Sequence, residues 1–161
     1  MSKKMLVAYF SCSGVTRRIA AALADSVGAD LYEIVPREPY SAADLNWMDR
    51  KSRSTLEMND PNARPAIAAA VPNMAEYDVV FVGFPIWWYV APRIIETFLE
   101  SYDFSGKTVV PFCTSGGSGV GGCDSKLHAN CSAATNWRSG RLWNGDVTTD
   151  ALRAWVDSLK L

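Results

Sequence analysis

The stretch "VAYFSCSGVT", residues 7–16, changes character in its middle. Its first four residues are apolar and end a run, residues 5–10, that predicts a short buried strand. Three hydroxyl side chains then surround Gly14, and helical spacing begins at once. Such a turn is typical either of a helix cap or of an anion site at a helix N-terminus, so the neighbouring motifs must distinguish the two.

Beyond this stretch, apolar strands alternate with helical spacing. Further strands are expected at residues 29–35, 77–84 and 107–113, with a weaker fifth at 140–145. Helices are expected at residues 15–27, 91–100 and 120–131, and a last one around 152–159 begins after Thr148 or Thr149. This alternation predicts an α/β fold with a five-stranded parallel sheet and helices on both faces.

Two features break this pattern. Residues 36–76 are about twice as long as a simple strand–helix connection needs, and one helix is expected within "SAADLNWMDRKSRSTLEM". We interpret them as an insertion between the second and third strands, either a lid or dimer contact near a ligand site or a solvated helix covering the sheet. Pro111 lies within the fourth expected strand, where it removes a ladder donor, so a local irregularity is expected there.

Composition and charge narrow the class of protein. A length of 161 residues with 48% hydrophobic content predicts a single globular domain over residues 1–161. Sixteen basic residues balance seventeen acidic ones, which favours no nucleic-acid partner. No apolar run is long enough to span a membrane and the N-terminus lacks a signal-peptide pattern, so we expect a cytoplasmic protein with no membrane partner.

The four cysteines form no C-x-x-C pair, and free thiols are expected in a cytoplasmic chain. A disulfide between Cys123 and Cys131 is the alternative. His128 precedes Cys131 by three residues, but two ligands do not make a zinc site. No metal is therefore expected, and His128 is interpreted as a surface residue.

Three loops carry the most unusual residues of the chain. In an open α/β sheet, ligands bind outside the carboxyl ends of the strands where the strand order reverses, so the loops after the first, third and fourth strands should meet. They read "SCSGVT" (11–16), "PIWWYVAP" (85–92) and "TSGGSGVGG" (114–122). The first offers hydroxyl and backbone N–H groups, the second flat aromatic side chains, and the third a backbone that a ligand can approach closely. A ligand with one phosphate and a planar ring fits all three, and FMN has this shape.

With these motifs the chain resembles the flavodoxin-like family. The first loop is similar to the family's phosphate signature, hydroxyl-x-hydroxyl-Gly-Asn-Thr, with Val15 in place of the Asn. The resemblance continues through "GFPIWW" and "FLESYDFSGKTVVPFCTSGGSG" and is close to a subgroup in which PIWW and TSGGSG occur together. It implies a three-layer, doubly wound sandwich with strand order 2-1-3-4-5.

The resemblance also implies how FMN is held. The first loop would bind the phosphate, the second would line one side of the ring, and the third would meet its pyrimidine edge. The implied cofactor-binding residues are Ser11, Cys12, Ser13, Gly14, Val15, Thr16, Pro85, Ile86, Trp87, Trp88, Tyr89, Thr114, Ser115, Gly116, Gly117 and Gly119. Trp87 has core packing as an equally weighted alternative, since adjacent residues usually point in different directions. No residue stands out as catalytic.

Other motifs are weaker. "GSGVGG" (117–122) matches G-x-G-x-x-G, but it follows the fourth strand rather than the first. Ser118 does not form a G-x-S-x-G elbow because position 120 is valine. A phospho-receiver domain would need acidic residues where the chain has "FSCSG" and "GFPIW". These classes are therefore set aside.

We expect an FMN-binding redox protein, and lean towards an NAD(P)H-dependent reductase of quinones or similar small acceptors. The alternative is a flavodoxin-type electron carrier that docks on protein donors or acceptors, and a remote alternative is a non-redox binding module. A carrier gains from an acidic surface that steers its partners, whereas the net charge here is −1, which favours the reductase. The chain is expected to act as a monomer or homodimer.

Overall fold

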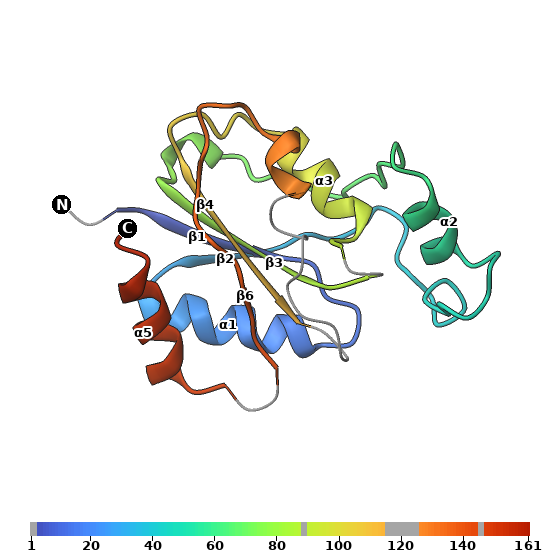
Figure 1. Ribbon diagram of the computed structural model, residues 1–161, viewed down its shortest axis with the longest axis horizontal. Helices are drawn as coiled ribbons and strands as arrows, with labels where there is room; N and C mark the ends of the chain where they lie inside the picture. The colour runs from blue at the N-terminus through green and yellow to red at the C-terminus, as the bar shows by residue number, and fades with distance from the viewer. Residues whose placement is uncertain (1–2, 88–89, 115–125, 145–146) are drawn as a thin grey trace.

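A parallel sheet with the predicted strand order forms the centre of the computed structural model, which describes residues 3–87, 90–114, 126–144 and 147–161 (Figure 1). In spatial order its strands are β2 (Asp30–Glu33), β1 (Met5–Tyr9), β3 (Val79–Pro85), β4 (Thr108–Thr114) and β5 (Asn136–Trp137). A sixth short strand, β6 (Arg141–Leu142), also pairs with β4. The predicted order 2-1-3-4-5 is confirmed.

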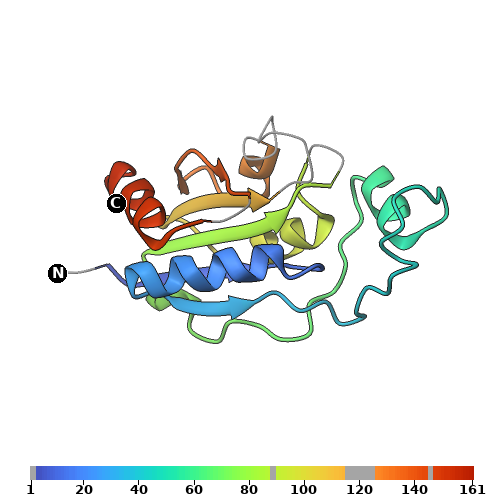
Figure 2. The same cartoon turned by 90° about the horizontal axis from the view of Figure 1, so that it is seen from below.

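Helices cover both faces of the sheet, as Figures 1 and 2 show. α1 (Val15–Val27) and α5 (Thr149–Ser158) pack against each other on one face, and α3 (Arg93–Glu100) covers the other. α1 ends as predicted at Gly28, whose φ of 68° suits glycine, and Thr148 caps α5 by accepting a hydrogen bond from the Ala151 N–H. Of the helix expected at 120–131, residues 126–131 are described: 126 and 127 are α-helical, and a 3₁₀ turn, η2 (His128–Asn130), follows them.

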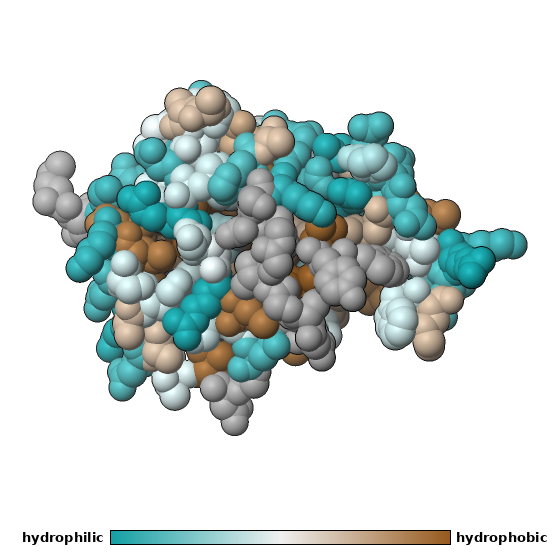
Figure 3. Space-filling view, viewed as in Figure 1, coloured by the Kyte–Doolittle hydropathy of each residue, from teal (hydrophilic) through white to brown (hydrophobic). Residues whose placement is uncertain are grey.

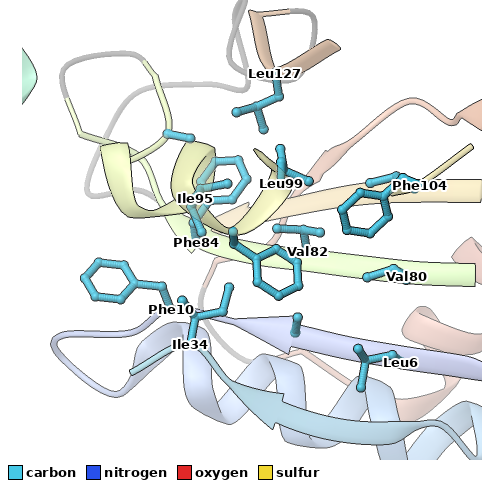
Figure 4. Close-up of a cluster of buried hydrophobic side chains, with 14 of the residues drawn as sticks. Leu6, Phe10, Ile34, Val80, Val82, Phe84, Ile95, Leu99, Phe104 and Leu127 are labelled. Carbon is cyan, nitrogen blue, oxygen red and sulfur yellow. The ribbon is translucent and has the colours of Figure 1, made fainter. Parts of the chain in front are cut away.

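Two hydrophobic cores join these layers. Alternate residues of β1 enter opposite cores, which is why the strand is apolar throughout. The core under α3 includes Leu6, Phe10, Ile34, Val82, Phe84, Ile95 and Leu99, drawn in Figure 4. The core under α1 and α5 includes Val7, Ile19, Leu23, Val110, Phe112 and Trp155.

Gly83 in β3 is required by the second of these cores. A Cβ built on Gly83 would lie 2.2 Å from the ring of Phe112, its neighbour on β4. That ring is fully buried, and protein interiors are close-packed, so moving it would disturb its neighbours. The glycine therefore allows a large aromatic side chain to lie across the sheet beside the strand that leads into the second loop.

The fifth position of the sheet differs from the prediction, because two short strands replace the one expected at residues 140–145. β5 pairs with Thr108 and Val109, and β6 pairs with Phe112 and Cys113, so pairing stops beside Pro111. The Val109 and Cys113 carbonyls both accept hydrogen bonds from this edge, from Arg138 N–H and Trp143 N–H. Pro111 has the same orientation as these residues but no N–H, and the expected irregularity is thus an interruption of the edge strand.

The insertion at residues 36–76 contains α2 (Arg53–Asn59) and a 3₁₀ turn, η1 (Met74–Glu76). α2 begins at Ser52, whose hydroxyl accepts a hydrogen bond from the Thr55 N–H. It lies beyond the carboxyl ends of the strands rather than over the sheet, as both ribbon views show. The expected helix is present, and the interpretation that it covers the sheet is wrong.

The surface is mixed in character. The face in Figure 3 shows hydrophilic residues interspersed with smaller apolar areas. Trp47 and Met48 of the insertion are 67% and 73% exposed. Within the described ranges, no helix has the length and apolar character that crossing a membrane requires.

Candidate functional site

The three predicted loops begin at one edge of the sheet, and hydrogen bonds tie their bases together. The Ile86 N–H, at the start of the second loop, donates to the Thr114 carbonyl at 2.8 Å, where the third loop starts. The buried hydroxyls of Thr16 and Thr114 lie 2.8 Å apart and share a hydrogen bond. Since Thr16 lies in the first turn of α1, the prediction that these loops meet is confirmed at their bases.

The first loop leads directly into α1 through a left-handed glycine. Gly14 occupies the N-cap position with a φ of 91°, and a Cβ built there would meet no atom within 4 Å. Glycine has no side chain to accept hydrogen bonds from the first-turn N–H groups, and no side-chain cap bond forms at this end of α1. The interpretation of this stretch as a Ser or Thr cap is therefore wrong for α1, and the geometry favours an anion site.

The hydroxyl groups of this loop have distinct environments. The Ser11 hydroxyl accepts a hydrogen bond from the Gly14 N–H at 3.1 Å, which holds the turn closed. Ser13 is exposed, whereas the Thr16 hydroxyl is buried against Thr114. The first turn of α1 has no acidic residue, and its Arg17 is paired with Glu33 at 3.0 Å. The loop therefore offers neutral donors to a ligand, with Ser13 as its accessible hydroxyl.

Cys12 lies between the two serines and is exposed. Neighbouring protein atoms nevertheless desolvate the thiol and raise its pKa to about 11, an effect that the charge of Arg53 partly offsets. The thiol is therefore protonated near neutral pH. It places no negative charge beside the helix N-terminus, which is compatible with a bound anion.

The second loop begins at Pro85 and Ile86, both half-buried. Trp87 and Val90 exchange backbone hydrogen bonds of 2.9 and 3.1 Å. Trp88 and Tyr89 lie outside the described residues, and so do Ser115, Gly116, Gly117 and Gly119 of the third loop. Of the third loop's predicted residues, Thr114 is described, and it is buried at the end of β4.

Trp87 is half-buried and packs against the core under α3. Its ring meets Phe10 edge-on at 5.8 Å between ring centres and Tyr40 edge-on at 5.6 Å. Phe10 and Tyr40 also meet each other, at 5.7 Å. These three aromatic residues, here called the aromatic cluster, support the packing role that was the alternative for Trp87.

Sequence reasoning missed Phe10 and Tyr40 as neighbours of the site. The sequence indicates Phe10 only as the end of a buried strand, although its place directly before the first loop is a usable signal. Tyr40 had no such signal, because it reaches Trp87 across the whole length of the insertion. Arg53 and Glu57, which contact Tyr40, were missed for the same reason.

Comparisons with known proteins give the chain a context. Residues 4–159 match the family model described as flavodoxin. A solved flavoprotein of Bacteroides eggerthii shares 51% identity and a TM-score of 0.94, covering 99% of each chain. One from Bacteroides uniformis shares 47% identity and a TM-score of 0.91, covering 98% of this chain and 99% of its own.

A more distant structure has a similar fold. A flavoprotein from Lactobacillus acidophilus in complex with FMN has a TM-score of 0.75 and covers 99% of this chain and 100% of its own. Its identity of 21% shows a shared fold alone. The search of curated proteins found no match.

Proposed function

Because the chain belongs to the flavodoxin family, we propose that it binds FMN and transfers electrons through it as an NAD(P)H-dependent reductase of quinones or similar small acceptors. One observation carries the proposal. The N-terminus of α1 opens onto free space at Gly14, between exposed and buried hydroxyls, at the edge where three loops begin. An uncapped helix N-terminus of this kind suits a phosphate dianion.

The residues present fit FMN. The first-turn N–H groups of α1 and the Ser13 hydroxyl would hold the phosphate. The Thr16 hydroxyl is buried and would support this turn through its hydrogen bond to Thr114. Pro85, Ile86, Trp87, Trp88 and Tyr89 would line the ring, and residues 114–119 would meet its pyrimidine edge. Bound FMN supplies hydride acceptance and electron transfer, and the chain supplies binding, orientation and exclusion of water.

The charge distribution favours a small acceptor over a protein partner. Cations and carboxylates of the described surface are interspersed and paired, as in Lys4–Glu76, Arg17–Glu33 and Arg64–Glu100. With a net charge of −1, the chain has little field to steer a basic partner protein. Small substrates need no such field. We infer a cytoplasmic setting, since Cys12 and Cys131 are free thiols.

Two measurements test this proposal. Heating the purified protein and separating the supernatant by chromatography should release FMN, and recovery of FAD, or no flavin together with failed reconstitution, would contradict it. The reconstituted protein should then oxidise NADPH or NADH only when a quinone is present. Flavin binding without such turnover, but with reduction by a protein donor, would support the electron-carrier alternative instead.

A further inference from the structure

We propose that Tyr40, on the insertion, is a positioning residue that holds Trp87 and thereby shapes the ring-binding side of the site. The proposal rests on the proposed FMN binding. Trp87 exchanges backbone hydrogen bonds with Val90, and Tyr40 meets its ring at 5.6 Å with an interplanar angle of 78°. This edge-to-face contact connects the insertion to the second loop.

Tyr40 is itself fixed by α2. Its hydroxyl donates a hydrogen bond to the Glu57 carboxylate, and the Arg53 guanidinium lies 3.8 Å from the centre of its ring. Arg53 and Glu57 are paired at 2.9 Å, with side chains only 22% and 14% exposed. Burial and the bond to Glu57 raise the pKa of Tyr40, so its hydroxyl remains a donor throughout the physiological range.

α2 is in turn anchored to α3. Arg93, the first residue of α3, donates hydrogen bonds to the Glu57 and Met58 carbonyls at 3.3 and 2.9 Å. Arg64 of the insertion binds Glu100 at the other end of α3 at 2.9 Å. Tyr40 is therefore connected through α2 to both ends of α3, and Trp87 meets a side chain that these contacts hold in place.

This arrangement predicts how a substitution of Tyr40 should change flavin binding. Tyr40 contacts the aromatic cluster, whereas the phosphate donors belong to α1 and the first loop. Tyr40→Ala should thus weaken the binding of FMN and of riboflavin by the same factor, about threefold to tenfold. It should also change the visible circular dichroism of the bound flavin, which reports the surroundings of the ring. Tyr40→Phe keeps the ring contact, so it should restore most of the flavin affinity and most of the circular dichroism signal.

Tyr32 provides a matched control. It lies on β2, its hydroxyl donates to the Ala69 carbonyl of the insertion, and its ring stacks on Phe98 at 6.1 Å. Tyr32→Ala therefore also removes an aromatic ring and a hydrogen bond to the insertion, but the ring contact it removes is with Phe98 rather than with the aromatic cluster. It should leave both flavin affinities and the visible circular dichroism unchanged, whatever it does to the melting temperature of the apo-protein.

The experiment is a titration of the wild-type protein and these variants with FMN and with riboflavin. Equal losses for both flavins in Tyr40→Ala, absent from Tyr32→Ala and reversed in Tyr40→Phe, support the proposal. Wild-type affinities in Tyr40→Ala, or equal losses in Tyr32→Ala, would overturn it. If Tyr40→Ala does not fold, Tyr40→Leu takes its place, with the same outcomes. A wild-type protein that binds neither flavin would instead overturn the proposed function, and this inference with it.

Discussion

The first and second loops of the candidate site meet at one edge of the sheet, yet they are held in different ways. The first loop is shaped locally, by Gly14 at a φ of 91° and by the Ser11 hydroxyl that accepts from the Gly14 N–H. The second loop is held from outside, because Trp87 packs against Phe10 and against Tyr40 of the insertion. One loop depends on residues three positions apart, and the other depends on residues far apart in the chain.

This difference implies that phosphate recognition and ring recognition are separable. A change in the first loop should affect a flavin that has a phosphate, whereas a change around the second should affect every flavin. Thr16 is the exception, because it lies in the first turn of α1 but its hydroxyl is bound to Thr114 on β4. The following predictions test where the boundary between the two kinds of recognition lies.

The largest effect is expected from the ligand itself. Riboflavin lacks the phosphate and thus loses several hydrogen bonds to a charged group, each of which contributes about 1.5–3 kcal/mol. The wild-type protein should bind FMN about 1000-fold more tightly than riboflavin, because two or more such bonds are lost together. Fluorescence titration measures both affinities. A ratio below about tenfold would mean that the first loop does not bind phosphate.

Ser13→Ala removes the accessible hydroxyl of the first loop. The affinity for FMN should fall about tenfold to a hundredfold, because one hydrogen bond to the phosphate is lost. Riboflavin affinity should not change. Ser13 is exposed, so the melting temperature of the apo-protein should also stay the same, and calorimetry checks this. Equal losses for the two flavins would remove the distinction between the loops.

Thr16→Val and Thr114→Val test the hydrogen bond between the first turn of α1 and the end of β4. Each substitution leaves the other buried hydroxyl without its partner and should lower the free energy of unfolding by about 1–3 kcal/mol. The double variant should lose clearly less than the sum, since both hydroxyls are then replaced by methyl groups of similar shape. Denaturant unfolding of the apo-proteins measures this coupling. Additive losses would mean that the two hydroxyls do not interact.

The smallest effect is expected at Trp88, a residue predicted from the sequence to stack on the ring. Trp88→Ala should weaken FMN and riboflavin alike, by about twofold to tenfold, because the stacking contact is worth about 0.5–1.5 kcal/mol beyond area burial. It should also shift the reduction potential of the bound flavin, which spectroelectrochemistry measures. A loss for FMN alone would place Trp88 on the phosphate side.

Much of the fold could be predicted because its signals are local. Buried strands such as β1 and β3 are apolar throughout, α1 has helical spacing that ends at a glycine, and α5 begins with a threonine cap. The family also followed from short motifs in consecutive residues, and the comparison confirms it. The split of the edge strand into β5 and β6 was missed, although Pro111 had marked its position.

The sequence by itself determined where most strands and helices lie, because their signals fall within one turn or one strand, and its short loop motifs carried the resemblance that implied the family and the strand order. Only the tertiary structure decided that the insertion lies beyond the strand ends and that Tyr40 meets Trp87. It also decided that Thr16 bonds to Thr114 and that Gly83 lies under Phe112. Such contacts join residues that no spacing rule relates, since they form only when separate layers pack and their side chains compete for the same buried space.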